Sequence, residues 1–123
     1  MQLFFKLGMK KRFHIKNNYE FQEIINKGKR VVTKNYILYY DQAKMVRNDR
    51  VGISASKKLG NAVERNKIRR QVRMMVDEIS DFNRGVDIII IVRNNYLSCS
   101  YEDNKKQLFK AYEKVYNNTV DEL

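Results

Sequence analysis

The sequence contains no proline and no tryptophan, and it has only one cysteine and one histidine. A single cysteine, Cys99, excludes an internal disulfide and a cysteine-based zinc site. A single histidine, His14, excludes a histidine cluster around a metal and argues against a catalytic triad with a histidine base. A chain without disulfides fits a reducing compartment, so we expect a cytoplasmic protein. No apolar run is long enough to span a membrane.

Acidic residues are also scarce, because 14 Asp and Glu oppose 25 Lys and Arg, which gives a formal net charge of +11. Such an excess on a small domain repels itself and predicts a polyanionic partner. Nucleic acid is the leading candidate. An anionic membrane surface comes second, because no exposed apolar face accompanies the basic residues.

The length of 123 residues and the hydrophobic content of 43% suit one domain with one core over residues 1–123. Residues 1–8 are too short and too weakly patterned for a signal peptide, and we expect them to be a disordered extension. The acidic tail over residues 117–123 is expected to fray.

Hydrophobic periodicity and capping residues divide the chain into alternating helices and strands. The predicted elements are a helix from Asn17 or Asn18 to residue 27, strands over 31–42 and 51–56, a helix from Asn61, a buried strand over 86–93 and a helix after Ser100. Phe109 is expected on the buried side of the last helix. This order predicts an α/β (α+β) two-layer sandwich, with helices packed on one sheet.

The two faces of the predicted strands differ in character. Alternation places Ile37 and Tyr39 on one face of strand 31–42 and the other large side chains on the opposite face. In strand 51–56 one face carries only small residues, including Gly52. A helix or a nucleic-acid strand can therefore approach that face closely.

The stretch over residues 57–73 combines an apolar stripe with a basic one. Asn61 is the expected N-cap of its helix. Ile68, Val72, Met75 and Ile79 recur at helical spacing and predict the buried side. At about 100° per residue the basic and amide side chains occupy an adjoining sector. That sector contains Arg65, Asn66, Arg69, Arg70 and Arg73.

The charge is concentrated in this part of the chain. Residues 44–73 hold ten Lys and Arg against two acids, whereas residues 98–123 hold four lysines against five acids. Arginine binds phosphate through two parallel hydrogen bonds. Lys57 and Lys58 precede a helix N-terminus, whose free N–H groups also favour an anion. The alternative, that the arginines pair with acids elsewhere in the fold, is disfavoured because too few acids are present.

The segment over residues 56–70, Ser-Lys-Lys-Leu-Gly-Asn-Ala-Val-Glu-Arg-Asn-Lys-Ile-Arg-Arg, resembles the signature of the bacterial ribonuclease P protein subunit. The match is long and specific. Residues 19–22 and 36–40 are similar to the first helix and first strand of that family, and residues 100–102 to the start of its last helix. The resemblance covers residues 9–116.

The resemblance implies a fold similar to the second domain of a ribosomal S5 protein, with a left-handed βαβ crossover that the general right-handed rule would not predict. It also implies the function of a ribonuclease P protein subunit. Such a subunit binds the catalytic RNA and the 5′ leader of precursor tRNA and assists endonucleolytic removal of the leader. The implied partners are ribonuclease P RNA and precursor tRNA, without a small-molecule substrate. The expected cofactor, Mg²⁺, is held mainly by RNA phosphates.

The resemblance also assigns roles to individual residues. It implies no catalytic residue and no metal ligand in the protein. The positions that would contact the catalytic RNA are Lys57, Lys58, Asn61, Arg65, Asn66, Lys67, Arg69, Arg70 and Arg73. The positions implied for the cleft that holds the leader are Phe21, Tyr39, Lys16, Arg12 and Lys11.

Some of these positions have a second interpretation or depart from the family pattern. Helical spacing alone favours Phe21 as a core residue, and the resemblance gives it a shared role in stacking on bases. Lys67 stands where arginine is common, so charge remains while the bidentate grip is lost. His14 stands where a basic residue is usual.

Two other functions remain open on the sequence. A structural RNA-binding module, such as a ribosomal protein, has the same composition. A protein nuclease using carboxylates and metal is the other. Its acids would come from a scattered set that shows no close pair on a predicted face, namely Asp41, Asp49, Asp77, Asp81 and Asp87.

Overall fold

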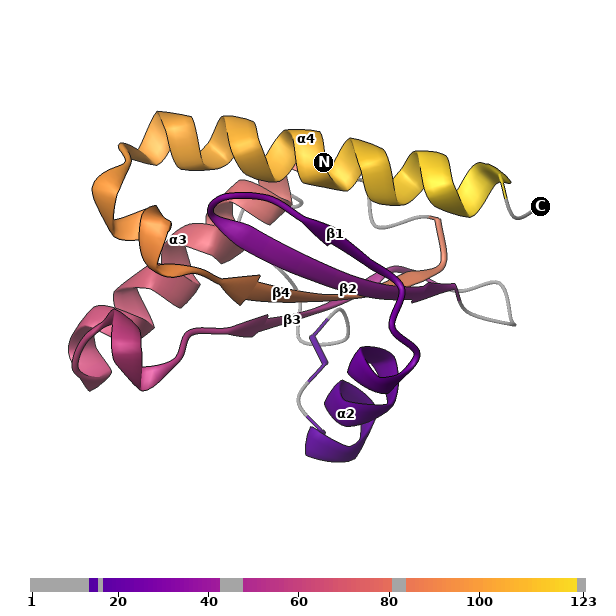
Figure 1. Cartoon of the computed structure of the whole chain (residues 1–123), viewed down its shortest axis with the longest axis horizontal. Helices are drawn as coiled ribbons and strands as arrows, with labels where there is room; N and C mark the ends of the chain where they lie inside the picture. The colour runs from indigo at the N-terminus through magenta and orange to yellow at the C-terminus, as the bar shows by residue number, and fades with distance from the viewer. Residues whose placement is uncertain (1–13, 16, 43–47, 81–83, 122–123) are drawn as a thin grey trace, which may run out of the picture.

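A four-stranded sheet forms the centre of the computed structural model, which describes residues 14–15, 17–42, 48–80 and 84–121. Helices α3 and α4 cover one face of the sheet, and the short helix α2 lies against the other (Figure 1). The α+β sandwich is confirmed, with α2 as an additional partial layer. The bounds are α2 Asn18–Asn26, β1 Arg30–Val32, β2 Tyr36–Gln42, β3 Arg50–Ser54, η2 Lys57–Leu59, α3 Ala62–Ile79, β4 Val86–Val92, η3 Asn94–Ser98 and α4 Tyr101–Asp121.

The strands lie in the order β1-β2-β4-β3. β1, β2 and β4 pair antiparallel, whereas β3 and β4 pair parallel and are joined through α3. β4 is therefore internal, and Ile88, Ile89 and Ile90 are all fully buried, as expected for a continuous apolar strand covered on both faces. The parallel β3–α3–β4 connection is the crossover that the resemblance implies. The left-handedness of this crossover stays a prediction.

The single strand predicted over residues 31–42 is wrong, because the chain turns back within it. Thr33 and Tyr36 close the turn between β1 and β2: the N–H of Thr33 donates to the carbonyl of Tyr36 at 2.8 Å, and the N–H of Tyr36 donates to Thr33 Oγ1 at 3.0 Å. Asn35 in this turn is fully buried. Its amide donates to Asn104 Oδ1 at the start of α4, 2.5 Å away. A tertiary contact thus stabilises a turn that contains no glycine or proline.

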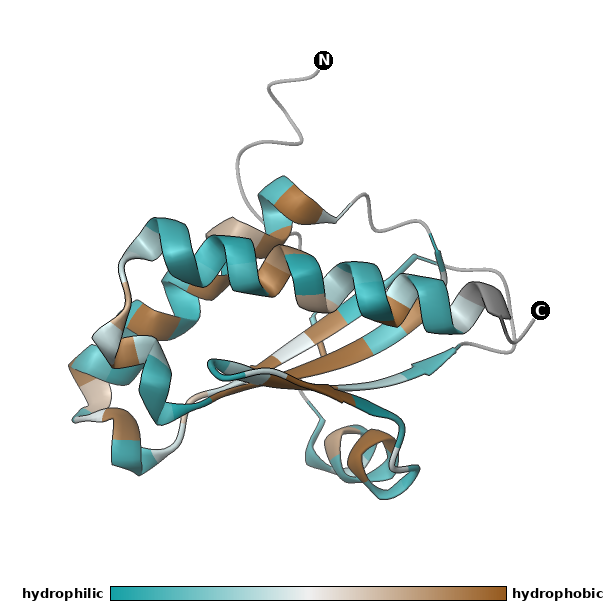
Figure 2. Cartoon of the chain, turned by 45° about the horizontal axis from the view of Figure 1, so that its top comes forward, coloured by the Kyte–Doolittle hydropathy of each residue, from teal (hydrophilic) through white to brown (hydrophobic). Residues whose placement is uncertain are grey.

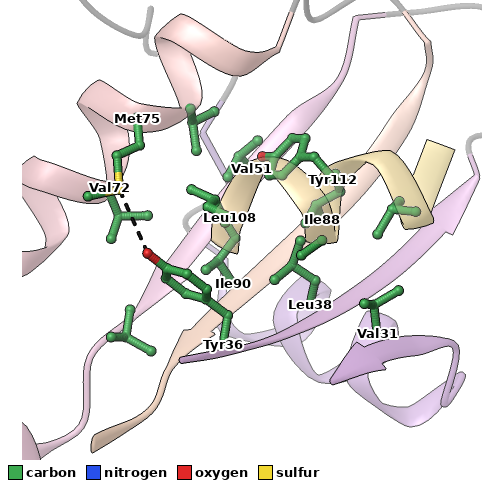
Figure 3. Packing of buried hydrophobic residues seen from close by; sticks show 14 of the residues in the cluster. Val31, Tyr36, Leu38, Val51, Val72, Met75, Ile88, Ile90, Leu108 and Tyr112 are labelled. Atoms are coloured by element: carbon green, nitrogen blue, oxygen red, sulfur yellow. Dashed lines mark hydrogen bonds between the residues drawn. The ribbon is translucent and has the colours of Figure 1, made fainter. Parts of the chain in front are cut away.

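The main core lies between the sheet and the pair α3 and α4 (Figure 3). Leu38 and Ile90 from the sheet pack with Val72 and Leu108 from the helices. Tyr36 is also fully buried, and its hydroxyl donates to the Asn104 carbonyl at 2.9 Å, which satisfies the one polar atom of the ring. In Figure 2 the middle of the sheet is mostly hydrophobic, whereas the outer side of α4 is mostly hydrophilic.

The predicted stripe of α3 is largely confirmed. Ile68, Val72 and Met75 are buried, and Ile79 is partly buried against the same core. Val76 joins them on the neighbouring position and was not predicted. The strand faces are confirmed too, since Tyr39 lies on the side opposite the main core.

Two expectations about α4 are wrong. Phe109 is 48% exposed, because the buried stripe of α4 is the neighbouring one, formed by Leu108, Tyr112 and Val115. Residues 117–121 are helical rather than frayed. Two of the polar side chains here find partners: the Asn118 amide donates to Tyr40 Oη at 3.1 Å, and the buried Thr119 hydroxyl donates to the Tyr116 carbonyl. Residues 1–8, expected to be a disordered extension, and residues 122–123 of the expected frayed tail lie outside the described residues.

The helix starts agree with the predicted caps. The side chain of Asn17 accepts the N–H of Tyr19 at 2.8 Å and thereby caps α2. At the start of α4, Ser100 Oγ accepts the N–H of Asp103 at 3.2 Å. Both caps use the short polar side chains that the sequence offered for them.

Replacing Ile68 with alanine should lower the free energy of unfolding by about 2–5 kcal/mol, because the substitution leaves a cavity in the main core. Urea unfolding followed by circular dichroism measures this value. Val63→Ala on the same helix is the matched control, since Val63 is 77% exposed and its truncation should change stability by less than about 0.5 kcal/mol. Equal losses in the two variants would show that the buried side of α3 is misassigned.

Candidate nucleic-acid interface

The start of α3 is held by a reciprocal capping box. Asn61 Oδ1 accepts the N–H of Glu64 at 2.9 Å, and Glu64 Oε1 accepts the N–H of Asn61 at 3.1 Å. Gly60 precedes the cap with a φ of +136°, and a Cβ there would come within 2.9 Å of the Glu64 carboxyl carbon. The Gly-Asn pair is thus explained by the start of the helix: Gly60 leaves room for the Glu64 carboxyl group, and Asn61 caps α3. This arrangement also means that Asn61 Oδ1 is occupied by the cap, and that the acid of this turn binds backbone rather than an arginine.

The basic and amide side chains of α3 lie outside its fully buried stripe and are at least partly accessible. Asn66, Lys67 and Arg70 are exposed, and Arg65, Arg69 and Arg73 are half-buried. The Arg69 guanidinium donates to Asn66 Oδ1. Lys57 and Lys58 in η2 are exposed just ahead of this helix. All nine residues expected to contact RNA therefore lie in η2, at the N-cap or on α3, and their contact with RNA stays a prediction.

These cations are not neutralised by acids of the described residues. The ion pairs found there involve Lys27, Arg50 and Lys105, and none involves a Lys or Arg between residues 57 and 73. The Arg65 Nε is buried and has no hydrogen-bond partner in the described part of the chain. We will call the outward surface formed by residues 57, 58, 61, 65–67, 69, 70 and 73 the basic surface.

Aromatic side chains gather on the other face of the sheet, under α2. Phe21 and Tyr39 are both half-buried against a cluster formed by Ile15, Ile24 and Ile89. The Phe21 ring lies directly over Gly52, where a Cβ would approach Phe21 Cζ to 2.5 Å. The prediction that the small face of this strand admits a helix is confirmed. Lys16, Arg12 and Lys11, the other residues expected near the leader, lie outside the described residues.

Ion pairs attach both ends of α2 to the sheet. The Arg50 guanidinium binds Glu20 at 2.6 Å and Asp87 at 3.0 Å, so it links α2, β3 and β4. At the other end of α2, Lys27 Nζ lies 2.6 Å from Asp41 Oδ2. A hydrogen bond to the Asp87 carboxylate is the main cause that raises the pKa of Arg50. The Asp41 carboxylate raises the pKa of Lys27 in the same way. These contacts fix the helix that carries Phe21.

The expectation that no two candidate acids lie close together is wrong. Asp41 and Asp87 are directly opposite each other across β2 and β4. Such a pair of like charges is unfavourable unless it is compensated, and Lys27 and Arg50 supply the compensation. The sequence contained one signal of this arrangement. Asp87 is an acid within the isoleucine-rich β4, and a buried carboxylate requires a partner.

Asp49 has a structural role that the sequence did not reveal. It is fully buried, and its Oδ1 accepts the N–H groups of Arg84 and Val86 at 2.9 and 3.0 Å. Its Oδ2 accepts the Tyr116 hydroxyl at 2.9 Å. This carboxylate joins the start of β3, the start of β4 and α4. Within the described residues no group of three or more His, Cys, Asp or Glu side chains is placed to hold a metal ion.

Comparison with known proteins identifies the family to which this arrangement belongs. The family model for ribonuclease P matches residues 9–116. The chain belongs to the ribonuclease P protein family. Its relatives include the ribonuclease P protein component of Bacillus cereus strain AH187, which is 38% identical over 107 residues, covering 86% of this chain and 93% of the relative.

Solved structures of the family have the same fold. A mutant of the RNase P protein from Staphylococcus aureus is 34% identical, with a TM-score of 0.79 over 86% of this chain and 90% of that one. The RNase P protein from Thermotoga maritima, at 23% identity, shares the fold with a TM-score of 0.68 over 79% and 92% of the two chains. Membership of the family gives this chain a role in the ribonuclease P enzyme complex and in processing of the tRNA 5′ end. None of its described helices combines the length and apolar character needed to cross a bilayer.

Gly52→Ala should displace Phe21 and lower the free energy of unfolding by about 1–3 kcal/mol, as overpacking of a filled site does. Ser54→Ala, on the same face of β3, adds no atoms and is the control. Urea unfolding of both variants, and of each combined with Phe21→Ala, tests the contact. In the Phe21→Ala background the cost of Gly52→Ala should largely vanish; an unchanged cost would mean that Phe21 does not pack on Gly52.

Proposed function

We propose that the chain binds the catalytic RNA of ribonuclease P through the basic surface, and the 5′ leader of precursor tRNA on the face of the sheet that carries α2. The RNA removes the leader, and the protein positions the substrate. The observation that carries the proposal is the basic surface itself. In the described residues its Lys and Arg side chains have no acidic partners. The family to which the chain belongs acts in tRNA 5′ processing, so an RNA is the expected partner of these charges.

The rigidity of α3 supports this assignment. Its aliphatic stripe is buried against the sheet and its first turn is closed by the capping box. The helix that carries the arginines is therefore held in one position. Arg65, Arg69 and Arg73 recur every four residues and form one row along it. A row of guanidinium groups at helical spacing suits the regularly spaced phosphates of an RNA strand, which arginine binds through paired hydrogen bonds.

The leader is assigned to the α2 face because aromatic rings are accessible there. Phe21 and Tyr39 are half-buried, so each ring has one part packed on the isoleucine cluster and another part open to a ligand. Stacking of a base on such a ring contributes about 1–3 kcal/mol and depends little on the base. Lys16, Arg12 and Lys11 are assigned to the leader phosphates on sequence grounds. The two RNA contacts thus use opposite faces of the sheet.

In this proposal Mg²⁺ is bound mainly by RNA phosphates, and no protein side chain takes part in the bond-breaking step. Oxygen ligands from phosphates satisfy the octahedral preference of Mg²⁺. Three of the five candidate acids of a protein nuclease are otherwise engaged, and Asp81 lies outside the described residues. Asp41 and Asp87 bind Lys27 and Arg50, and Asp49 holds backbone N–H groups.

Reconstitution at low Mg²⁺ tests the function. Adding the purified protein to the catalytic RNA should raise the rate of precursor tRNA cleavage, because protein cations replace part of the charge screening that Mg²⁺ provides. Protein alone should cleave nothing. Cleavage by RNA-free protein, or the absence of any stimulation, would contradict the proposal.

Arg69→Ala should weaken binding to the catalytic RNA and reduce the slope of log K against log salt concentration by about 0.7–0.9 for each phosphate that the variant no longer neutralises. Its free energy of unfolding should stay within about 0.5 kcal/mol of the parent. Filter binding over a salt series gives the slope.

Lys106→Ala on α4 is the matched control for Arg69→Ala. It removes the same charge from an exposed helix position outside the basic surface. Its RNA affinity and salt slope should remain close to those of the parent chain. If both variants show the same decrease in affinity, general charge rather than the basic surface determines RNA binding.

A further inference from the structure

A cavity of about 270 Å³ lies beside the basic surface, between α3, η3 and the first turn of α4. Its apolar wall is formed by Ile68, Tyr96 and Leu97. Pockets for drug-sized ligands measure roughly 300–1,000 Å³, so this one suits a smaller group. Leu97 is 56% exposed and provides an apolar rim.

The residues that line the cavity also carry polar groups whose hydrogen-bonding capacity is not used within the described residues. The Tyr101 hydroxyl is buried and has no partner there. Burial raises the pKa of Tyr101, so its hydroxyl stays protonated and can donate. Gln71 accepts the Tyr96 hydroxyl through Oε1 at 2.8 Å, which leaves its amide N–H₂ group to donate elsewhere. An apolar wall with a few polar groups beside it is typical of a site for a small ligand, and a base, a ring with a polar edge, matches this combination.

The charges at the cavity are placed to favour the phosphate of a nucleotide at one point and its base at another. Lys67 belongs to both the cavity and the basic surface, so an ammonium group stands at the boundary between them. Glu64 lines the cavity too, and one of its carboxylate oxygens is used by the capping box. An anion is disfavoured beside this carboxylate, whereas an exocyclic amino group of a base can donate to it. The geometry therefore favours a phosphate at Lys67 and a base inside.

We propose that this cavity receives a single unstacked nucleobase of an RNA bound along the basic surface. The inference deepens the proposed function and rests on it. Unstacked bases are the features that proteins read in folded RNA, through stacking and through hydrogen bonds to the base edge. The proposed function assigns the basic surface to the catalytic RNA, which makes that RNA the expected source of the base; the experiment below separates it from precursor tRNA.

A buried amide network keeps the wall of the cavity in place. Asn104 donates to the Tyr96 carbonyl at 3.1 Å and accepts from Asn35, whose own Oδ1 accepts the Asn95 amide at 2.6 Å. The turn between β1 and β2 is thus linked to η3 and α4. The site is consequently preformed, and a base entering it does not have to order η3.

Cys99 makes the proposal directly testable, because it lines the cavity and is the only cysteine in the chain. The rate of its alkylation by iodoacetamide is measured by mass spectrometry for the full chain. The probes are the four nucleoside 5′-monophosphates, with ribose 5-phosphate as the probe that lacks a base. At least one nucleotide should slow alkylation, and ribose 5-phosphate should not. Equal protection by ribose 5-phosphate, or no protection by any nucleotide, would overturn the inference.

The same measurement with catalytic RNA and with precursor tRNA, added separately, identifies the source of the base. The RNA that inserts it should protect Cys99 and the other should not. If both RNAs bind and neither protects Cys99, the inference is wrong while the proposed function stands. If neither RNA binds at all, the proposed function fails, and the nucleotide measurements still decide whether the cavity takes a base.

Tyr101→Phe supplies an independent test, with Tyr112→Phe as its matched control. Both substitutions remove a buried hydroxyl that has no partner in the described residues, and both lie on α4, but Tyr112 is in the main core. Tyr101→Phe should weaken binding of the protecting RNA about three- to tenfold, the effect of one hydrogen bond, with an unchanged salt slope. Tyr112→Phe should bind as the parent does. Equal affinities of the two variants would contradict a base hydrogen-bonded to Tyr101.

Discussion

The burial of one aliphatic stripe of α3 against the sheet is the constraint on which the rest of the structure depends. Ile68, Val72 and Met75 hold the helix in one rotational setting, since any other setting would expose them to water. The arginines of the same helix then lie outside the buried stripe. The hydrophobic core thereby determines where the basic surface lies, although no arginine takes part in that core.

The sheet separates two surfaces of different chemistry. Because β4 is internal and apolar on both sides, the sheet has a main core under α3 and α4 and a smaller cluster under α2. The basic surface is assigned to the side with α3 and α4, and the aromatic surface to the side with α2. The Arg50 and Lys27 ion pairs position α2 on its side, where burial of apolar area alone is small.

Local signals predicted much of this arrangement from the sequence. Helical spacing, the Asn61 cap and alternation in the strands each depend on neighbours in the chain, and each was confirmed. The turn between β1 and β2 was missed because Asn35 is held by Asn104, 69 residues away. Asp41 and Asp87 were taken as scattered, because strand register, which pairs them, is decided by the sheet. Phe109 was placed inward because its spacing did not separate it from the stripe beside it.

The sequence by itself determined the charge, the two stripes of α3 and the family, since these depend on residue types and their spacing. Only the tertiary structure decided which polar groups are paired. It showed that Asp49 holds three segments together and that the Tyr101 hydroxyl is buried without a partner in the described residues. The physical reason is that hydrogen bonds and ion pairs require groups to meet within about 3–4 Å. For residues far apart in the chain, packing alone brings them to that distance.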